Sequence, residues 1–115
     1  MNFVMNGRTW KIVELSQDKI REEYKKYKYD GEPEQGKYFG LTYFDSQTIY
    51  VDADLHIQQK KQTLRHELMH CYLGCYGWGS SHDRFNEEDL CNIFSSAYDI
   101  IQSVINQYFS NEESR

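Results

Sequence analysis

The spacing of apolar and polar residues divides the first half of the chain into short strands and one helix. Aromatic and β-branched residues are enriched in Arg8–Leu15, Tyr38–Phe44 and Thr48–Asp52, which predicts three strands. Only Asp45-Ser46-Gln47 separates the last two, a spacing typical of a hairpin. Apolar residues alternate with polar ones in Thr48–Asp52, which indicates an antiparallel strand with one buried face.

Helical periodicity accounts for most of the remaining chain. Gln17–Tyr29 is highly charged with a narrow apolar stripe, as in a surface helix that Ser16 could cap. Two longer helices follow, the first ending at Gly77 and the second capped by Asn86. We expect their buried stripes to be Leu64, Leu68, Cys71, Tyr72 and Cys75, and Leu90, Phe94, Ala97, Tyr98, Ile101, Ile105 and Tyr108. The sequence therefore predicts an α+β fold, a small antiparallel sheet packed on these two helices.

Length and charge restrict the kind of protein. A chain of 115 residues with 39% hydrophobic residues is expected to form a single domain over 1–115. Its formal net charge of -5 argues against nucleic acid as a partner, because phosphate binding requires clustered Lys and Arg. No apolar stretch approaches the roughly 20 residues of a membrane span, and the first residues lack the pattern of a signal peptide. We therefore expect a cytoplasmic protein without a membrane partner; nothing in the sequence specifies an oligomeric state.

The three cysteines support the same compartment. Cys71, Cys75 and Cys91 are an odd number and lack the spacing of a secreted disulfide framework. Cys71 and Cys75 could share a metal, since they lie one helical turn apart, but buried packing is the simpler interpretation. We expect all three to be buried thiols.

The residues that point to chemistry are His66-Glu67-Leu68-Met69-His70, an H-E-x-x-H sequence within the first long helix. At 3.6 residues per turn, the two imidazoles lie only about 40° apart around the axis, so both can reach one Zn²⁺. Leu64 and Leu68 point away from them, so burying the leucines turns the histidines toward a cleft. Glu67 projects beside such a metal, where a carboxylate can take a proton from a metal-bound water.

A catalytic zinc requires a third protein ligand and one open position. The longer H-E-x-x-H-x-x-G-x-x-H pattern is excluded, because the chain has Leu73 and Tyr76 where that pattern needs Gly and His. Glu88, in the first turn of the second long helix, is our choice, and Asn92 on the same face could orient a ligand histidine. Glu87 is the alternative acid, and His82 and His56 are rival ligands. Acidic residues in a first helical turn also stabilise the helix dipole without any metal.

These residues resemble the small zinc metallopeptidases of the gluzincin type, in particular the ImmA/IrrE-like group and the minimal minigluzincin domains. The resemblance covers about half the chain, from Thr48–Asp52 through Thr63–His70 to Glu88–Phe94, which is similar to the E-x-x-A-N-x-F helix of that group. Cys91 stands where the group usually has Ala, and the chain lacks the further domain of some members. The family resemblance implies a zinc site of His66, His70 and Glu88.

The same resemblance implies that Glu67 is the general base and that Thr48–Asp52 is the edge strand of a peptide-binding cleft. An exposed strand edge can bind an extended peptide through main-chain hydrogen bonds. The oxyanion donor stays open among Tyr43, Tyr50, Tyr76 and His82. The resulting hypothesis is a zinc-dependent endopeptidase with a protein or peptide substrate, by analogy a regulatory protein of a phage or mobile element. The alternatives are a non-catalytic, zinc-supported interaction module and a zinc hydrolase of a non-peptide bond.

Overall fold

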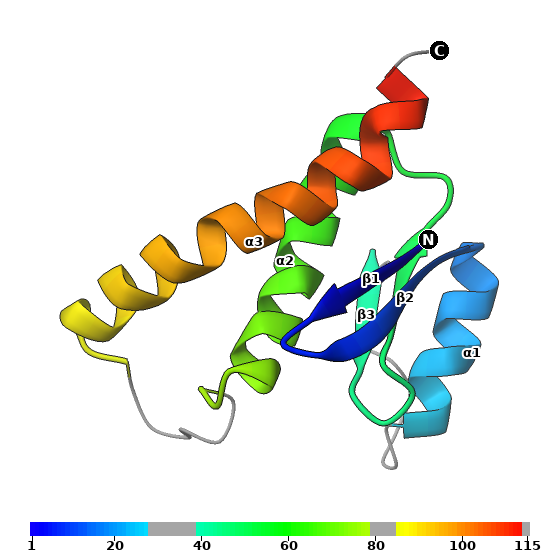
Figure 1. The fold of residues 1–115 in the computed structure, drawn as a ribbon. Helices are drawn as coiled ribbons and strands as arrows, with labels where there is room; N and C mark the ends of the chain where they lie inside the picture. Colours follow the sequence, from blue (N-terminus) through cyan, green and yellow to red (C-terminus); the bar gives the residue numbers. More distant parts are fainter. Residues whose placement is uncertain (28–38, 79–84, 114–115) are drawn as a thin grey trace.

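Four strands and three helices make up the residues that the computed structural model describes, 1–27, 39–78 and 85–113. They follow the order β1 (Asn2–Met5), β2 (Arg8–Leu15), α1 (Gln17–Tyr27), β3 (Gly40–Tyr43), β4 (Thr48–Asp52), α2 (Ile57–Cys75) and α3 (Glu87–Glu113). Helix α1 lies on one side of the sheet, and α2 and α3 lie on the other (Figure 1). The α+β class expected from the sequence is confirmed. None of the helices in these ranges is long and apolar enough to cross a membrane.

The strands form one mixed sheet in the order β1-β2-β4-β3. Strands β1 and β2 pair antiparallel, as do β3 and β4, but β2 and β4 pair in parallel. The expectation of an antiparallel sheet is therefore wrong at its centre. The residues between β2 and β4 include α1, and a crossover of that length permits parallel pairing. Alternation along one strand shows which face is buried but carries no information on the direction of its neighbour.

The β1–β2 hairpin is an element that the sequence interpretation missed. Asn6 and Gly7 connect its strands with φ angles of 49° and 77°, as in a two-residue turn that requires left-handed backbone at both positions. The Asn6 side-chain amide donates a hydrogen bond of 2.7 Å to the carbonyl oxygen of Cys75. The Asn-Gly pair was the available sequence signal, and the hairpin it forms contacts the end of α2.

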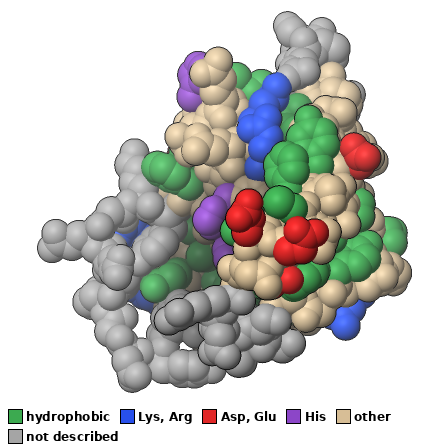
Figure 2. Space-filling model, turned by 90° about the vertical axis from the view of Figure 1, so that its left-hand side faces the viewer, with side chains coloured by type: hydrophobic (Ala, Val, Ile, Leu, Met, Phe, Trp, Pro, Cys, Tyr) green, Lys and Arg blue, Asp and Glu red, His purple; other side chains and the backbone are tan. Residues whose placement is uncertain are grey.

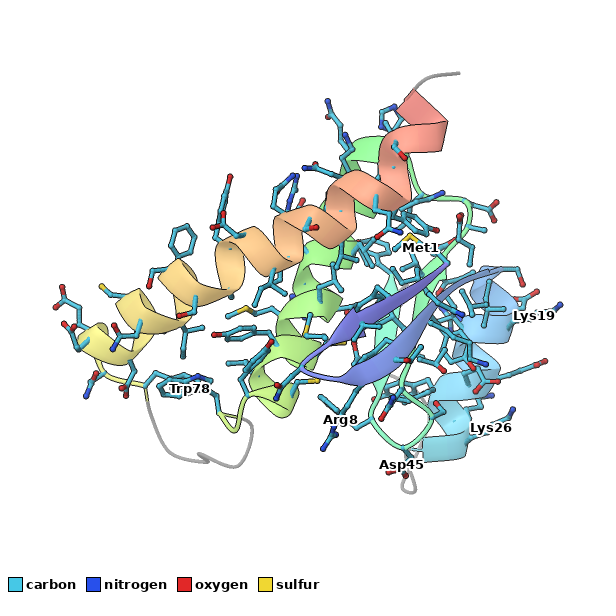
Figure 3. All side chains as sticks on the ribbon, viewed as in Figure 1. Met1, Arg8, Lys19, Lys26, Asp45 and Trp78 are labelled. Atoms are coloured by element: carbon cyan, nitrogen blue, oxygen red, sulfur yellow. The ribbon has the colours of Figure 1, made fainter. Side chains whose placement is uncertain are left out.

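The main core lies between the sheet and the two long helices, where side chains fill the space (Figure 3). Strand β4 contributes Ile49 and Val51, both fully buried. Thr48 and Asp52 on the opposite face are also buried, so the expectation that only one face of this strand is covered is wrong. A strand with a neighbour on each side and α1 over its second face has little surface left for solvent.

Helix α2 follows its predicted pattern closely. All five residues of the expected stripe are buried, and Gly77 adopts a φ of 86° just after the helix ends. Burial raises the pKa of the Cys71 thiol, with Cys75 and Glu67 adding to the effect, so Cys71 is a neutral packing residue here. The expectation of three buried cysteines holds for Cys71 and Cys75 and is wrong for Cys91, which is exposed on α3.

Helix α3 begins at the predicted cap. The Asn86 side-chain oxygen accepts a hydrogen bond of 2.7 Å from the backbone N–H of Asp89, whose carboxylate accepts one of 3.2 Å from the N–H of Asn86. The predicted stripe is buried only in part, because Leu90, Phe94 and Tyr98 are exposed. Figure 1 shows α3 crossing α2 and separating from it toward the N-terminal end of α3. The first turns of the stripe therefore border a groove instead of entering the core.

Candidate active site

The H-E-x-x-H residues lie in the middle of α2, and the two histidines are on the part of the helix that faces away from its buried stripe. His66 and His70 are both exposed, and their ring centroids lie 5.0 Å apart with the ring planes at 75°. Leu64 and Leu68 are fully buried beneath them. The outward position of the two imidazoles is what the helical spacing predicts, and it allows both to bind a single ion from solvent.

Glu67 points in a different direction from the histidines, toward the sheet. Its side chain is buried, with a residue exposure of 7%. The Thr42 hydroxyl of β3 donates a hydrogen bond of 2.7 Å to Glu67 Oε1, and the Glu67 carbonyl oxygen lies 3.3 Å from the same hydroxyl. Within the described ranges no other hydrogen bond reaches this carboxylate, so Oε2 keeps its capacity to accept a proton.

Thr42 was not singled out in the sequence interpretation. It falls inside the predicted strand, and its alternation places it on one face of β3, but no local signal identifies the helix residue that it meets. The contact depends on the packing of β3 against α2, which is a tertiary property. Thr42 is therefore a residue of the candidate site that only the structure reveals.

Gly40 allows this close packing. A Cβ atom at Gly40 would lie 2.9 Å from Thr63 Cγ2 and 3.0 Å from Glu67 Cγ, distances that side chains do not tolerate. The carbonyl oxygen of Tyr50 would lie 3.1 Å away on the β4 side. A residue without a side chain at this position thus sets how near β3 can lie to the Glu67 side chain.

The strand beside the motif is β3, not the expected Thr48–Asp52. Strand β4 pairs with β2 on one side and β3 on the other, so it is an interior strand, and the expectation that it forms the cleft edge is wrong. Among the described strands, β3 has one paired side and is an edge strand. A cavity of about 290 Å³ lies between β3 and α2, lined by Phe39, Gly40, Gln59, Gln62, Thr63, His66 and Glu67.

Among the described residues, no third metal ligand lies beside the two histidines. The described residues contain no group of three His, Cys, Asp or Glu side chains placed to hold a metal ion. Glu88 and the alternative Glu87 are exposed in the first turn of α3, as is Asn92 one turn further on. His56 lies at the N-cap of α2, and His82 lies outside the described residues. His66 and His70 fit two ligand positions of a zinc site, and this conformation leaves the third unfilled by any described side chain.

The candidate oxyanion donors are not grouped at the site either. The rings of Tyr43 and Tyr50 contact each other, with centroids 5.7 Å apart, and Tyr76 lies against Tyr72 beyond the end of α2. None of these tyrosines lines the cavity that contains His66 and Glu67. His82, the remaining candidate, lies outside the described ranges.

Comparison of the chain with protein-family models, with curated proteins and with solved structures found no match. The class of the protein is therefore argued from its residues. The site consists of the paired imidazoles, the buried Glu67 held by Thr42, and the edge strand β3 beside them.

Proposed function

We propose that this protein is a cytoplasmic zinc-dependent endopeptidase whose active site is built on His66, Glu67 and His70. One observation carries the proposal. The H-E-x-x-H sequence lies on an exposed helical face with its imidazoles 5.0 Å apart, while the carboxylate between them is fixed by a strand hydroxyl. Two imidazole ligands and a preoriented base are part of the arrangement for metal-assisted hydrolysis of a peptide bond, which also needs a third protein ligand.

Each residue has a separate role in this proposal. His66 and His70 bind the ion, which when bound supplies Lewis acidity and lowers the pKa of a water toward about 7. Glu67 accepts the proton of the attacking water at Oε2 and passes it to the leaving amine. The Thr42 hydroxyl donates to Oε1 and so restricts the rotation of the Glu67 carboxylate, which lines the cavity. The outer edge of β3, which pairs with no other described strand, offers main-chain groups to an extended substrate segment.

The third ligand in the proposal is Glu88. It is supported by the position of Glu88 in the first turn of the helix that packs on α2, and by the resemblance of Glu88–Phe94 to the ligand helix of gluzincins. In the described conformation α3 separates from α2 toward this end (Figure 1), so coordination requires α3 to approach α2. Glu87 and His82 are the competing ligands. The same resemblance suggests a regulatory protein of a phage or mobile element as the substrate.

Metal content and cleavage together test the proposal. We expect about one zinc per purified wild-type chain, retained in Glu67→Gln and lost in His66→Ala and His70→Ala. His56→Ala, at the exposed N-cap of α2 outside the motif, should retain zinc, and loss of zinc in it would make His56 the third ligand. Glu67→Gln should abolish cleavage of an unfolded-protein panel. A wild-type protein without bound metal would refute the proposal.

Two further measurements refine the assignment. Zinc affinity should fall more in Glu88→Gln than in the neighbouring Glu87→Gln or in His82→Ala, and the reverse order would reassign the ligand. Nucleic-acid and ester panels, run beside the unfolded proteins, distinguish peptide hydrolysis from hydrolysis of another bond. These comparisons need no knowledge of the natural substrate.

A second candidate is a non-catalytic interaction module. Its support is the exposed apolar surface of α3, where Leu90, Phe94 and Tyr98 are each more than half exposed, at 54%, 68% and 53%. The absence of a third ligand near the histidines among the described residues also favours it. If Glu67→Gln left every biochemical effect of the protein intact, this candidate would replace the peptidase.

A further inference from the structure

A mainly apolar groove lies between α2 and α3, apart from the Glu67 cavity. Its volume is about 660 Å³, within the range of about 300 to 1,000 Å³ typical of ligand-binding pockets. The floor and walls are mainly apolar. The lining residues are Met69, Leu90, Ile93, Phe94, Ala97, Tyr98 and Ile101, together with the polar Gln62, Arg65, His66 and Gln102.

The α3 wall of this groove is an exposed hydrophobic stripe. Leu90, Phe94 and Tyr98 follow one another at four-residue steps, so their side chains lie on one face of the helix. Single exposed apolar residues are common, but three in a row beside a concave surface mark an interaction site. Their spacing forms ridges of the kind into which another helix packs.

Opposite charges lie at the two ends of the groove. Arg65, accompanied by Gln62 and Gln102, lines one end, and no carboxylate among the described residues forms an ion pair with it. The acidic first turn of α3 lies beyond Leu90 at the other end, and Glu87 shares the helical face of Leu90 and Phe94. Figure 2 shows basic and acidic side chains on this face with hydrophobic side chains between them.

We propose that this groove binds an amphipathic helical segment of another polypeptide, with an acidic residue against Arg65 and a basic residue against the first turn of α3. The apolar face of such a segment would cover Phe94 and its neighbours. A membrane surface is disfavoured as the occupant, since the protein carries a net charge of -5 and cytoplasmic leaflets are anionic. Binding in the groove requires neither zinc nor the Glu67 carboxylate, but His66 lines the groove, and an approach of α3 to α2 for coordination by Glu88 would narrow it.

A displayed library of amphipathic helical peptides, with each charged position varied between Glu and Lys, provides the probe. Peptides selected on the wild-type protein should carry Glu at one end of the apolar face and Lys at the other. Their affinity should fall at least tenfold in Phe94→Ser, because burying a Phe contributes about 1.5 to 3 kcal/mol. Val4→Ser is the matched control, since Val4 on β1 is as exposed as Phe94, at 65% and 68%, but does not line the groove.

Exchanging the charges of Arg65 and the peptide residue that faces it tests the orientation of the bound peptide in the groove. Arg65→Glu should weaken the selected peptide by up to about fivefold, the range of an exposed ion pair, and replacing the facing peptide Glu by Lys should restore binding. Binding should be unchanged in Glu67→Gln, which separates this result from the fate of the peptidase proposal. Selection of no peptide, equal affinity in Phe94→Ser, or a dimer in light scattering that Phe94→Ser dissolves would each overturn the proposal; the last would make the groove an interface between two copies.

Discussion

Thr42→Val gives the most direct test of how the fold holds Glu67. The substitution replaces a hydroxyl with a methyl group of nearly the same size, so packing of β3 on α2 is kept. It removes the hydrogen bond of 2.7 Å to Glu67 Oε1 and leaves the carboxylate buried at 7% exposure. The wild-type protein and Thr42→Val therefore differ mainly in one hydrogen-bond donor to Glu67.

The expected cost follows from the charge and burial of the acceptor. A hydrogen bond to a charged group contributes about 1.5 to 3 kcal/mol, and a buried acceptor left without a donor loses that contribution. For a domain of this size the midpoint of thermal unfolding should fall by about 6 to 12 °C. Thr42→Ser keeps the hydroxyl and should recover most of the loss.

A double-mutant cycle identifies the interaction. Urea unfolding of wild type, Thr42→Val, Glu67→Leu and the double variant gives the coupling free energy. On the Glu67→Leu background, Thr42→Val should change the free energy of unfolding by less than about 0.5 kcal/mol, because no charge is then left unpaired. Equal costs on both backgrounds would refute the argument that Thr42 acts through Glu67.

Three further outcomes follow from other contacts. Gly40→Ala should destabilise the fold by about 1 to 3 kcal/mol in thermal unfolding and reduce any Glu67-dependent cleavage, because the added methyl group would lie 2.9 Å from Thr63 Cγ2 and 3.0 Å from Glu67 Cγ and displace these side chains. Burial alone would raise the pKa of Glu14, but hydrogen bonds from Lys60 and Tyr108 outweigh it, so the pKa lies below the ordinary 4.5. Glu14 thus stabilises the fold above about pH 4.5 and loses that effect as the pH falls further. In urea titrations the loss of free energy of unfolding caused by Glu14→Gln should therefore become smaller in acid. A loss that does not change with pH would contradict this. Cys91 should react with a maleimide in the native protein while the two thiols of α2 react only on unfolding, as a mass-spectrometric time course would record.

The elements themselves were largely predictable because their signals are local. The stripe of α2, its end near Gly77 and the Asn86 cap all depend on residues a few positions apart. The β3–β4 hairpin was predicted for the same reason. Parallel pairing of β2 with β4 was not, since it joins residues such as Lys11 and Thr48 that are distant in the chain.

The residues of the candidate site show the same difference between local and tertiary signals. His66, Glu67 and His70 were predicted from a five-residue pattern on one helix, and the helix places the two imidazoles on one side as the spacing requires. Thr42 and Gly40 were missed because their roles exist only where β3 meets α2. The prediction that Phe94 is buried was wrong for a related reason. Periodicity gives the direction of a side chain but not the distance to the opposing helix.

The length of α3 has a consequence for local stability. Its 27 residues extend about 40 Å, close to the 42 Å of the longest dimension of the molecule, whereas the 19 residues of α2 extend only about 28 Å. The C-terminal half is fixed by the buried Phe109 and by the hydrogen bond from Tyr108 to Glu14. The N-terminal turns have fewer buried side chains, so they can open without global unfolding. Amide protection should therefore decline along α3 toward its first turn, and the binding energy of any ligand there includes the free energy of closing those turns.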